Sequence, residues 1–517
     1  MTDGGRPTLA DLAQVLGTVA PPHPLTPVTG VTLDSRRVAP GDLYAALPGA
    51  NVHGARFSAQ AAAAGAAAVL TDPAGRADAE ATGLPVLVVD APRAVLGDLA
   101  RRVHGDPGQR LTTFGVTGTN GKTTTAYLVE SLWRSAGWTT GLLGTVETRI
   151  AGERVSSVRT TPEAPDLHAL LARMVAAGVR GCALEVSSHA LAQHRVDGLV
   201  VDVAAFTNLS QDHLDFHGSM EEYLAAKARL FTPQHSRRGV VWTDPADPDG
   251  WGRRVAELAT VPVETVGPDG AGADWSVRDV HAERARSSFR LTGPDADLHL
   301  TSPLPGAFNV ANAAVAAVAA FRLGLTASQV EGGLAHAEGV PGRMQAVLRD
   351  GAPLVVVDYA HTPDALERVL TTLRGSTPGR LVAVVGAGGD RDRGKRPLMG
   401  EVVARLADVA VVTDDNPRSE DPATVRAQVL AGARDSGGPA EVLEVGDRRA
   451  AVAAALAHCA GPHDTVLLAG KGHETGQEVA GVVTPFDDRA VADEELQVWR
   501  DRTRVSDGAL GARGGAQ

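Results

Sequence analysis

Short apolar runs that end in polar, glycine- or histidine-bearing loops recur along this chain. In its second half, such runs of four or five residues occupy Leu354–Val357, Leu381–Val385, Val409–Val412 and Thr465–Ala469. Because each run is short and apolar throughout, the pattern predicts buried strands rather than helices. Strand, polar loop and helix in repeated order predict an α/β fold with a mainly parallel sheet, with functional loops at the carboxyl ends of the strands.

The alternation of strands and helices divides the chain into three predicted domains. Residues 1–110 combine strand-like runs, such as Ala67–Leu70, with alanine-rich helical stretches. Residues 111–337 continue the strand–helix alternation, and residues 338–502 hold the four strands named above. The final segment, 503–517, has no such pattern and is expected to be a disordered tail.

A glycine-rich loop stands at the start of the second predicted domain. Residues 118–124 have the sequence GTNGKTT and lie between a short apolar run, Leu111–Val116, and a helical pattern, Ala126–Trp133. A strand, a glycine-rich loop that ends in Lys-Thr, and a helix form the usual geometry of a phosphate-binding loop, in which backbone N–H groups face the anion. The predicted ATP contacts of this loop are Gly118, Thr119, Asn120, Gly121, Lys122, Thr123 and Thr124.

Two side chains of this loop have distinct predicted roles, and one position departs from the common pattern. Lys122 would reach the terminal phosphates, and the Thr123 hydroxyl would bind Mg²⁺. The common pattern places a glycine five residues before Gly121, whereas this chain has Val116 there. The loop is therefore a variant. A glycine-rich turn that binds nothing is the alternative, and the Lys-Thr pair at the expected place disfavours it.

The composition and the net charge argue against several classes of function. Of the 517 residues, 44% are hydrophobic and 21% are charged, as in ordinary globular proteins with well-formed cores. A net charge of −12 argues against broad binding to nucleic acid or to anionic membranes. The two cysteines, far apart in sequence, allow no disulfide framework and no zinc spacing. No signal-peptide pattern and no long apolar stretch occur, so we expect a cytoplasmic protein without a membrane span.

Polar residues follow two further apolar segments of the second domain. Glu185 comes after the run Gly181–Leu184, and a carboxylate beside a phosphate loop is a natural Mg²⁺ ligand; a solvent-facing glutamate on a turn is the alternative. His213 lies in a polar loop, and Lys227 lies in a predicted helix, Met220–Leu230. Taken alone, a structural imidazole and a solvated lysine are the simpler interpretations of these two residues.

Loops rich in glycine and cations follow the strands of the third domain. They have the sequences GAGGDRDRGKRPLMG at 386–400, DDNPRSED at 414–421 and GKGHE at 470–474, and a fourth loop, DYAHTPD, occupies 358–364. Arginine and lysine in glycine-rich loops suit anionic ligands. A solvated surface loop explains any one of them, but it does not explain four such loops at four strand ends.

Nine motifs, in order along the chain, resemble those of the Mur ligases, the ATP-dependent amino-acid ligases of peptidoglycan synthesis. They are GTNGKTTT, EVSSHAL, FTNLSQDHLDFHG…K, GAFN…N, GRM, DYAHTPDAL, GGDRDRGKRPLMG, DDNPR and GKGHE. Including earlier UDP-contact matches, the resemblance covers about Leu33 to Glu474. It implies a small N-terminal α/β domain that binds UDP, a central P-loop ATPase and a C-terminal Rossmann-like domain that carries the amino-acid site.

The resemblance is strongest to the family member that adds the third amino acid. It implies that ATP and Mg²⁺ are used to join meso-2,6-diaminopimelate to UDP-N-acetylmuramoyl-L-alanyl-D-glutamate. ATP would phosphorylate the D-glutamate γ-carboxylate, and the amine would then attack the acyl phosphate. The expected partners are these small molecules alone, and a monomer is expected.

Matching positions imply the individual roles. For the UDP-substrate they are Leu33, Ser35, Ala50, Asn51, Val52, Thr160, Thr161, Ser187, Gln193 and Arg195. Further ATP contacts match Asn312, Arg343 and Asp358. The amino-acid site matches Arg391, Asp415, Asn416, Pro417, Arg418, Gly470 and Glu474. Magnesium ligands match Glu185, His213 and Lys227, the last as a carbamate, beside Thr123; the catalytic candidates are Lys122, His213 and Lys227. Arg159 stands where the compared member has asparagine, and no contact is assigned to it.

The expected preference for diaminopimelate over lysine depends on Arg418. Diaminopimelate has a carboxylate and an ammonium at its far end, whereas lysine has only the ammonium, so a fixed guanidinium would favour the former. A surface arginine paired with the nearby acids Asp414, Glu420 and Asp421 is the alternative.

Other functions stay open on the sequence alone. A lysine-adding ligase, a folylpolyglutamate synthase-like ligase, and a nucleotide switch or non-catalytic homologue are the alternatives. The cationic loops of the third domain fit folylpolyglutamate synthase poorly. The intact set of Lys122, Glu185, His213 and Lys227 argues against a non-catalytic copy.

Overall fold

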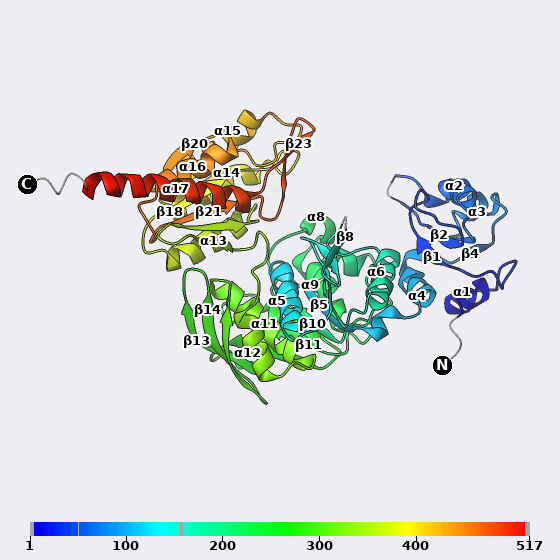
Figure 1. Cartoon of the computed structure of the whole chain (residues 1–517). Coiled ribbons are helices and arrows are strands. Elements are labelled where there is room, and N and C mark those ends of the chain that lie inside the picture. Colours follow the sequence, from blue (N-terminus) through cyan, green and yellow to red (C-terminus); the bar gives the residue numbers. More distant parts are fainter. Residues whose placement is uncertain (1–4, 50, 156–158, 512–517) are drawn as a thin grey trace, which may run out of the picture. The chain divides into compact units, whose positions relative to one another are not determined.

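The computed structural model describes residues 5–49, 51–155 and 159–511, with residues 504–511 described by their backbone only. The chain divides into two compact units (Figure 1). The first comprises 1–279, 290–300 and 311–337, and the second comprises 280–289, 301–310 and 338–517. The boundaries of the three predicted domains stay predictions. None of the helices in the described ranges combines the length and the apolar character needed to cross a membrane.

A four-stranded parallel sheet opens the chain. Its order is β1 (Gly30–Thr32), β2 (Asp42–Ala46), β3 (Ala68–Thr71) and β4 (Val86–Val88). Its helices are α1 (Leu9–Leu16), α2 (Ser58–Ala63), α3 (Arg76–Glu80) and α4 (Pro92–Val103), with 3₁₀ turns η1 (Gly54–Phe57) and η2 (Pro107–Arg110). Every residue of β2 and β3 is buried, as expected for parallel strands covered on both faces.

The predicted phosphate loop follows a central strand of a larger, eleven-stranded sheet. In order it contains β15 (Asp297–Ser302), β14 (Ser287–Thr292), β13 (Trp275–Ala282), β12 (Val263–Pro268), β11 (Gly239–Trp242), β10 (Val203–Phe206), β5 (Thr112–Thr117), β9 (Gly181–Glu185), β6 (Thr140–Leu143), β7 (Thr148–Ile150) and β8 (Glu153–Val155). The neighbours β10, β5 and β9 are parallel. The loops that follow these three strands therefore leave the sheet at the same edge, which is where ligands bind in such sheets.

The expected strand–helix alternation is wrong between β12 and β15. Over residues 263–302, all of which the structure describes, four strands follow one another without a helix between them. In β14, with the sequence SSFRLT, buried residues alternate with partly exposed ones. This period of two is typical of a strand with one covered face. The neighbouring strand β15, with the sequence DLHLTS, alternates in the same way, so the signal for both strands was present in the sequence.

Among the described residues, six helices connect strands of this sheet, and two more follow β15, its last strand in sequence. They are α5 (Lys122–Ser135), α6 (Ala164–Ala176), α7 (Ser188–Ala192), α8 (Leu214–His217), α9 (Met220–Ala228), α10 (Trp251–Leu258), α11 (Ala307–Arg322) and α12 (Ala327–Ala335), with the 3₁₀ turn η3 (Arg229–Phe231). Helix α5 begins at Lys122, four residues before the predicted start at Ala126. The phosphate loop therefore passes directly into the helix.

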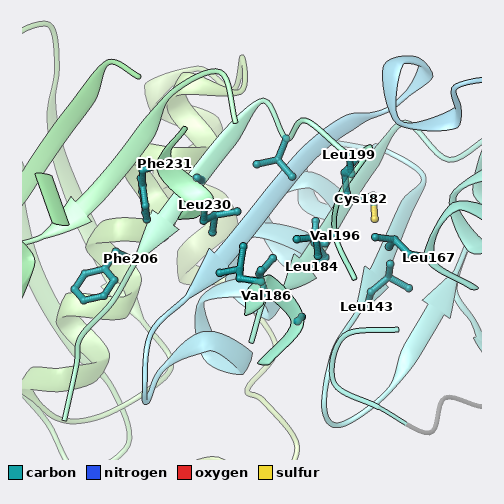
Figure 2. Packing of buried hydrophobic residues seen from close by; sticks show 14 of the residues in the cluster. Leu143, Leu167, Cys182, Leu184, Val186, Val196, Leu199, Phe206, Leu230 and Phe231 are labelled. Carbon is teal, nitrogen blue, oxygen red and sulfur yellow. The ribbon is translucent and has the colours of Figure 1, made fainter. Parts of the chain in front are cut away.

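Side chains of β9 and β10 contribute to a core cluster around this sheet. Figure 2 shows Leu184 from β9 and Phe206 from β10 together with Leu143, Leu167 and Phe231 from neighbouring elements. All five are at most 1% exposed. Because such an interior is closely packed, the strand ends that carry the loops are held on a rigid base.

A six-stranded sheet forms the centre of the second unit. Its order is β16 (Gln345–Val347), β17 (Leu354–Asp358), β21 (Thr465–Ala469), β18 (Leu381–Val385), β19 (Val409–Val412) and β20 (Glu441–Glu444). All pairings are parallel except that of β16 with β17. The four strands predicted from the apolar runs are thus adjacent, and their four polar loops emerge at one edge.

Helices cover the two faces of this sheet. They are α13 (Pro363–Ser376), α14 (Lys395–Leu406), α15 (Pro422–Asp435), α16 (Arg448–Ala457) and α17 (Asp488–Gly511), and a separate hairpin pairs β22 (Gly476–Val479) with β23 (Val482–Pro485). Alternate strand residues such as Val355, Val382 and Val466 share one core with α16 and α17. Helix α17 continues from its packed first half into the segment 503–511, so the predicted disordered tail is helical up to Gly511.

Candidate active site

The glycine-rich loop has the conformation of a phosphate-binding loop. It connects the end of β5 at Thr117 with the start of α5, and Gly118 and Gly121 have φ angles of +154° and +86°. Glycine adopts such angles without the steric clash that a Cβ causes. A Cβ at Gly121 would also collide with the side-chain amide of Asn312 on α11. The predicted contact residue Asn312 therefore lies directly against the loop.

Two lysines converge on one carbonyl oxygen of this loop. Nζ of Lys122 donates to the carbonyl oxygens of Gly118 and Thr119, each at 2.9 Å. Nζ of Lys227, on α9, donates to the same Gly118 oxygen at 2.8 Å and lies 4.5 Å from the ring centre of Tyr223. Lys227 is 1% exposed. Burial, reinforced by repulsion from Lys122, holds its pKa well below the ordinary value of a lysine.

Glu185 is the centre of a hydrogen-bonded cluster beside the loop. Its Oε2 accepts a hydrogen bond from the Thr123 hydroxyl at 3.0 Å. The backbone N–H of Thr145 donates to Oε1 at 2.7 Å, and the Thr145 hydroxyl donates to Oε2 at 3.1 Å. Glu185 is 1% exposed, so the alternative of a solvent-facing glutamate is wrong. Thr145 was missed by the sequence reasoning, although it follows a short apolar strand, β6, as the predicted residues follow theirs.

His213 takes part in an aromatic cluster. It has a φ of +54° at the start of α8, pairs with Asp212 at 3.3 Å, and its ring lies edge-on to His189, with centroids 4.7 Å apart. His217 is buried and its Nε2 lies 2.9 Å from the Ser188 hydroxyl. Across the described part of the chain, no three His, Cys, Asp or Glu side chains are grouped so that they could hold a metal ion.

Five of the predicted substrate residues of this unit form two hydrogen-bonded groups. The first is continuous with Glu185: the Thr161 hydroxyl donates to the Glu185 carbonyl oxygen at 2.9 Å and accepts from the Ser187 N–H at 3.1 Å, and Thr160 lies 3.0 Å from the Thr145 hydroxyl. In the second, Arg195 donates to the side chain of Gln193 at 2.5 Å.

A cavity of about 1120 Å³ contains the remaining predicted UDP-substrate residues that the structure places. Leu33, Ser35 and Val52 line it, and so does Arg159, to which the sequence assigned no contact. Asn51 is exposed in the same loop as Val52. Ala50 lies outside the described residues. The cavity and the Glu185 cluster both belong to the first unit.

The other two predicted ATP contacts belong to the second unit. The guanidinium of Arg343 lies over the ring of Tyr359, 4.6 Å from its centre. Asp358, at the end of β17, accepts hydrogen bonds from the N–H groups of Met344 at 2.7 Å and Ala360 at 2.8 Å. Burial raises the pKa of Asp358, and the charge of Arg343 opposes that shift.

The predicted amino-acid residues meet at the parallel strand ends of the second unit. The amide of Asn416 donates to Oε2 of Glu474 at 2.6 Å. Gly470 has a φ of +110°, and a Cβ there would lie 2.9 Å from Oδ2 of Asp415. Lys471 is fully buried beside these residues. Its Nζ lies 3.8 Å from the carboxylate of Asp415 and 3.6 Å from that of Glu474. Lys471 was missed as a site residue, although it stands in a glycine-rich loop directly after β21.

Arg418 is held by backbone contacts on both sides. Its Nη1 donates to the carbonyl oxygen of Gly389 at 2.7 Å, and its N–H donates to the carbonyl oxygen of Glu478 on β22 at 3.0 Å. Its φ of +52° is a strained angle for an arginine. Its Nε lies 3.9 Å from the Glu478 carboxylate. Arg391 lies nearby against Gly388, and Pro417 packs against Gly389.

Three acidic residues that lie near Arg418 in the sequence pair with other residues. Asp414 pairs with Arg426 at 2.5 Å, Glu420 pairs with Arg396 at 2.7 Å, and Asp421 accepts from the Thr424 N–H at 3.0 Å as a helix cap. The simple surface-pair interpretation of Arg418 is therefore wrong for these three partners.

Three family models cover most of the chain. Residues 27–104 match "Mur ligase family, catalytic domain", residues 116–320 match "Mur ligase middle domain", and residues 342–472 match "Mur ligase, glutamate ligase domain". The chain belongs to the Mur ligase family. Its phosphate loop and Glu185 cluster lie within the second range, the amino-acid residues up to Gly470 lie within the third, and Glu474 lies just beyond it.

Individual Mur ligases are similar over nearly the whole length. A Streptomyces coelicolor protein named UDP-N-acetylmuramoyl-L-alanyl-D-glutamate–2,6-diaminopimelate ligase is 55% identical, covering 95% of this chain and 96% of that protein. A Leifsonia xyli protein named UDP-N-acetylmuramyl-tripeptide synthetase is 48% identical over 89% of this chain and 90% of its own. A solved structure of a diaminopimelate ligase of this name superposes with a TM-score of 0.69 at 33% identity, covering 95% and 99%.

Proposed function

We propose that the protein is an ATP-dependent, ADP-forming ligase that joins meso-diaminopimelate to the D-glutamate of UDP-N-acetylmuramoyl-L-alanyl-D-glutamate in peptidoglycan synthesis. The 55% identity to the Streptomyces coelicolor ligase, over 95% of the chain, is the observation that carries this proposal. The name of the Leifsonia xyli relative specifies a tripeptide but not its third amino acid. The choice of amino acid depends on the residues of the site itself.

The geometry of the phosphate loop suits transfer of a phosphoryl group to a carboxylate. A carboxylate is a poor acyl donor, because its leaving group would be oxide. Transfer of the γ-phosphoryl group of ATP converts it to an acyl phosphate, which the amine of the amino acid attacks with release of phosphate. Lys122 and the N–H groups at the start of α5 would stabilise the charge that develops on the phosphoryl oxygens.

The residues beside the loop fit Mg²⁺ in the chemistry of their donor atoms. Thr123 and Glu185 offer a hydroxyl and a carboxylate 3.0 Å apart, and Mg²⁺ prefers oxygen ligands. His213 is the third proposed ligand. When bound, the ion would neutralise charge on the phosphate oxygens.

Lys227 is proposed to act as a carbamate. Its neutral amine can react with CO₂ to give a carbamate and a proton, and its lowered pKa favours that neutral form. The carbamate would replace a buried cation with an anionic oxygen donor near Lys122. The Gly118 carbonyl, which now accepts from both lysines, would keep the bond from Lys122.

Arg418 supports diaminopimelate over lysine. Its position is set by Gly389 and Glu478, and its guanidinium can hold a carboxylate through two parallel hydrogen bonds. Lysine has no second carboxylate for that guanidinium to bind. Its own ammonium would also lie near a second cation.

The proposed activity is tested by measuring phosphate release from ATP. Release should require the UDP-muramoyl-dipeptide together with meso-diaminopimelate, and Lys122→Ala should abolish it while the circular dichroism spectrum is unchanged. In parallel reactions, L-lysine replaces meso-diaminopimelate, and a folate substrate replaces the UDP-muramoyl-dipeptide. Equal turnover with L-lysine would overturn the amino-acid choice, and no turnover with any acceptor would overturn the ligase assignment.

A further inference from the structure

Thr145 connects the proposed magnesium ligand Glu185 with the proposed dipeptide residue Thr160. Its backbone N–H donates to Oε1 of Glu185 at 2.7 Å, and its hydroxyl donates to Oε2 at 3.1 Å. The hydroxyl oxygens of Thr145 and Thr160 lie 3.0 Å apart. All three residues belong to the first unit. Glu185 is buried, whereas Thr145 is exposed and Thr160 is partly exposed, so a bound molecule can reach the two threonines.

The loop that carries Thr145 is fixed against the carboxylate of Glu185. A Cβ at Gly144 would lie 2.5 Å from Oε1 of Glu185, so glycine is needed for the backbone to come this close. In the same loop, the carboxylate of Glu147 accepts a hydrogen bond from the Tyr127 hydroxyl at 2.9 Å. Tyr127 belongs to α5, the helix that follows the phosphate loop. The loop is therefore tied both to the carboxylate and to this helix.

The hydroxyl of Thr145 has one hydrogen and two possible acceptors. It can donate to Glu185 or to Thr160, but not to both at once. Oε2 of Glu185 also accepts from the Thr123 hydroxyl, at 3.0 Å, so two hydrogen bonds occupy its two lone pairs. A divalent cation at this oxygen competes with them for the same electrons. The Thr160 oxygen is then the alternative acceptor for the Thr145 hydrogen.

The same exchange depends on what Thr160 does with its own hydrogen. Where Thr160 donates to Thr145, the Thr145 hydrogen stays on the carboxylate of Glu185. Where an acceptor group of a bound molecule takes the Thr160 hydrogen, the Thr160 oxygen can accept from Thr145 instead, and Oε2 loses one hydrogen bond. Occupation of Thr160 by a ligand thus makes Oε2 more available to a cation.

We propose that Thr145 is a positioning residue that couples these two sites, so that a divalent cation at Glu185 and the UDP-muramoyl-dipeptide at Thr160 each tighten the binding of the other. The inference rests on the proposed function for the identity of both ligands. No covalent bond changes, since only the direction of two hydroxyl hydrogens differs between the states. The coupling is reciprocal, because each ligand changes the affinity of the other by the same factor.

The test measures Mn²⁺ binding to the full chain by electron paramagnetic resonance, with saturating UDP or with saturating UDP-muramoyl-dipeptide. UDP carries the same diphosphate, so the ratio of the two Mn²⁺ dissociation constants isolates the effect of the muramoyl-dipeptide. We expect this ratio to be about five in the wild type, the lower end of typical couplings. In Thr145→Val, which keeps the shape and the backbone N–H but has no hydroxyl, it should fall below about two. Thr145→Ser keeps the hydroxyl and should keep the ratio.

Thr113→Val is the matched control. The N–H and the hydroxyl of Thr113 both donate to Oδ2 of Asp202, at 2.8 and 3.1 Å, which repeats the arrangement of Thr145 and Glu185. Thr113 lies near the start of β5, whereas the phosphate loop follows the end of that strand. Its loss should lower the melting temperature and leave the Mn²⁺ ratio at the wild-type value.

Thr160→Val tests the coupling from its other end. It should also reduce the ratio, and the double variant Thr145→Val/Thr160→Val should lose no more than either single variant. A wild-type ratio in Thr145→Val would overturn the proposal, and so would a ratio near one in a wild-type protein that binds the UDP-muramoyl-dipeptide. If Thr145→Val does not fold, an unchanged ratio in Thr160→Val overturns it. Failure of the proposed function is distinguishable, because calorimetric titration would then show no binding of the dipeptide to the wild type, and the coupling would fall with it.

Discussion

Two fully buried lysines in this protein have opposite surroundings. Lys227 in the first unit has a carbonyl oxygen at 2.8 Å and an aromatic ring beside it, and the nearest charge that lowers its pKa is another lysine. Lys471 in the second unit lies between the carboxylates of Asp415 and Glu474 and donates to the Gly476 carbonyl oxygen at 2.5 Å. Burial alone therefore does not decide what a lysine does.

The difference lies in how each buried charge is compensated. An ammonium without a carboxylate partner is destabilised in a low-dielectric site, so it tends to lose its proton and becomes a nucleophilic amine. An ammonium between carboxylates keeps its proton, and its charge orders the loops around it. Lys227 thus suits chemistry, and Lys471 suits the positioning of Asp415, Asn416 and Glu474. The predictions below test this contrast.

Lys227→Ala should produce the largest effect. Loss of the carbamate removes an anionic ligand from the phosphoryl-transfer site, so kcat should fall by about 10³-fold or more, on the order of 4 kcal/mol of barrier. Acetate should restore part of the activity by occupying the space of the carbamate. Full activity of the variant without acetate would show that this lysine is not needed for chemistry.

Lys471→Met should mainly affect stability. The substitution keeps the apolar bulk but leaves the buried carboxylate of Asp415 without its cation, which costs about 3 kcal/mol of unfolding free energy. Urea denaturation of the wild type and the variant measures this loss. The double variant Lys471→Met/Asp415→Asn should recover part of it; if it does not, the ion pair is not the source of the effect.

Arg418→Ala should affect one substrate. The KM for diaminopimelate should rise about 10–100-fold, since a bidentate contact to a carboxylate contributes about 1.5–3 kcal/mol. The KM for ATP should change little. Arg426→Ala is a suitable control, because Arg426 pairs with Asp414 and Glu444 in the same region. An equal rise in both KM values would mean that Arg418 supports the loop rather than the ligand.

The smallest effect concerns the pH dependence of stability. The folded-state pKa of Lys227 is lowered below that of the unfolded chain, so between these two pKa values the unfolded chain binds more protons than the folded one, and stability rises with pH. In CO₂-free buffer, Lys227→Met should therefore be more stable than the wild type at pH 7, by about 1 kcal/mol. The difference should shrink as the pH approaches about 10.4, where the unfolded lysine loses its proton. A constant difference across this range would contradict the lowered pKa.

Much of this site could be predicted from local sequence. The four apolar runs of the second half are strands within one residue of their predicted ends, because parallel buried strands are apolar throughout. The phosphate loop was identifiable because its glycines, its Lys-Thr pair and the helix that follows are all local features. The sequence pattern also predicted that polar loops follow the strands, and so indicated most of the residues discussed above.

The tertiary structure alone decided which of these residues meet. The order β10–β5–β9 places Glu185 beside Thr123, and β6 beside β9 brings Thr145 to the same carboxylate. Strand order depends on contacts between distant segments, and no local periodicity encodes it. The same reason applies to the burial of Lys471, whose partner Asp415 lies in a different loop.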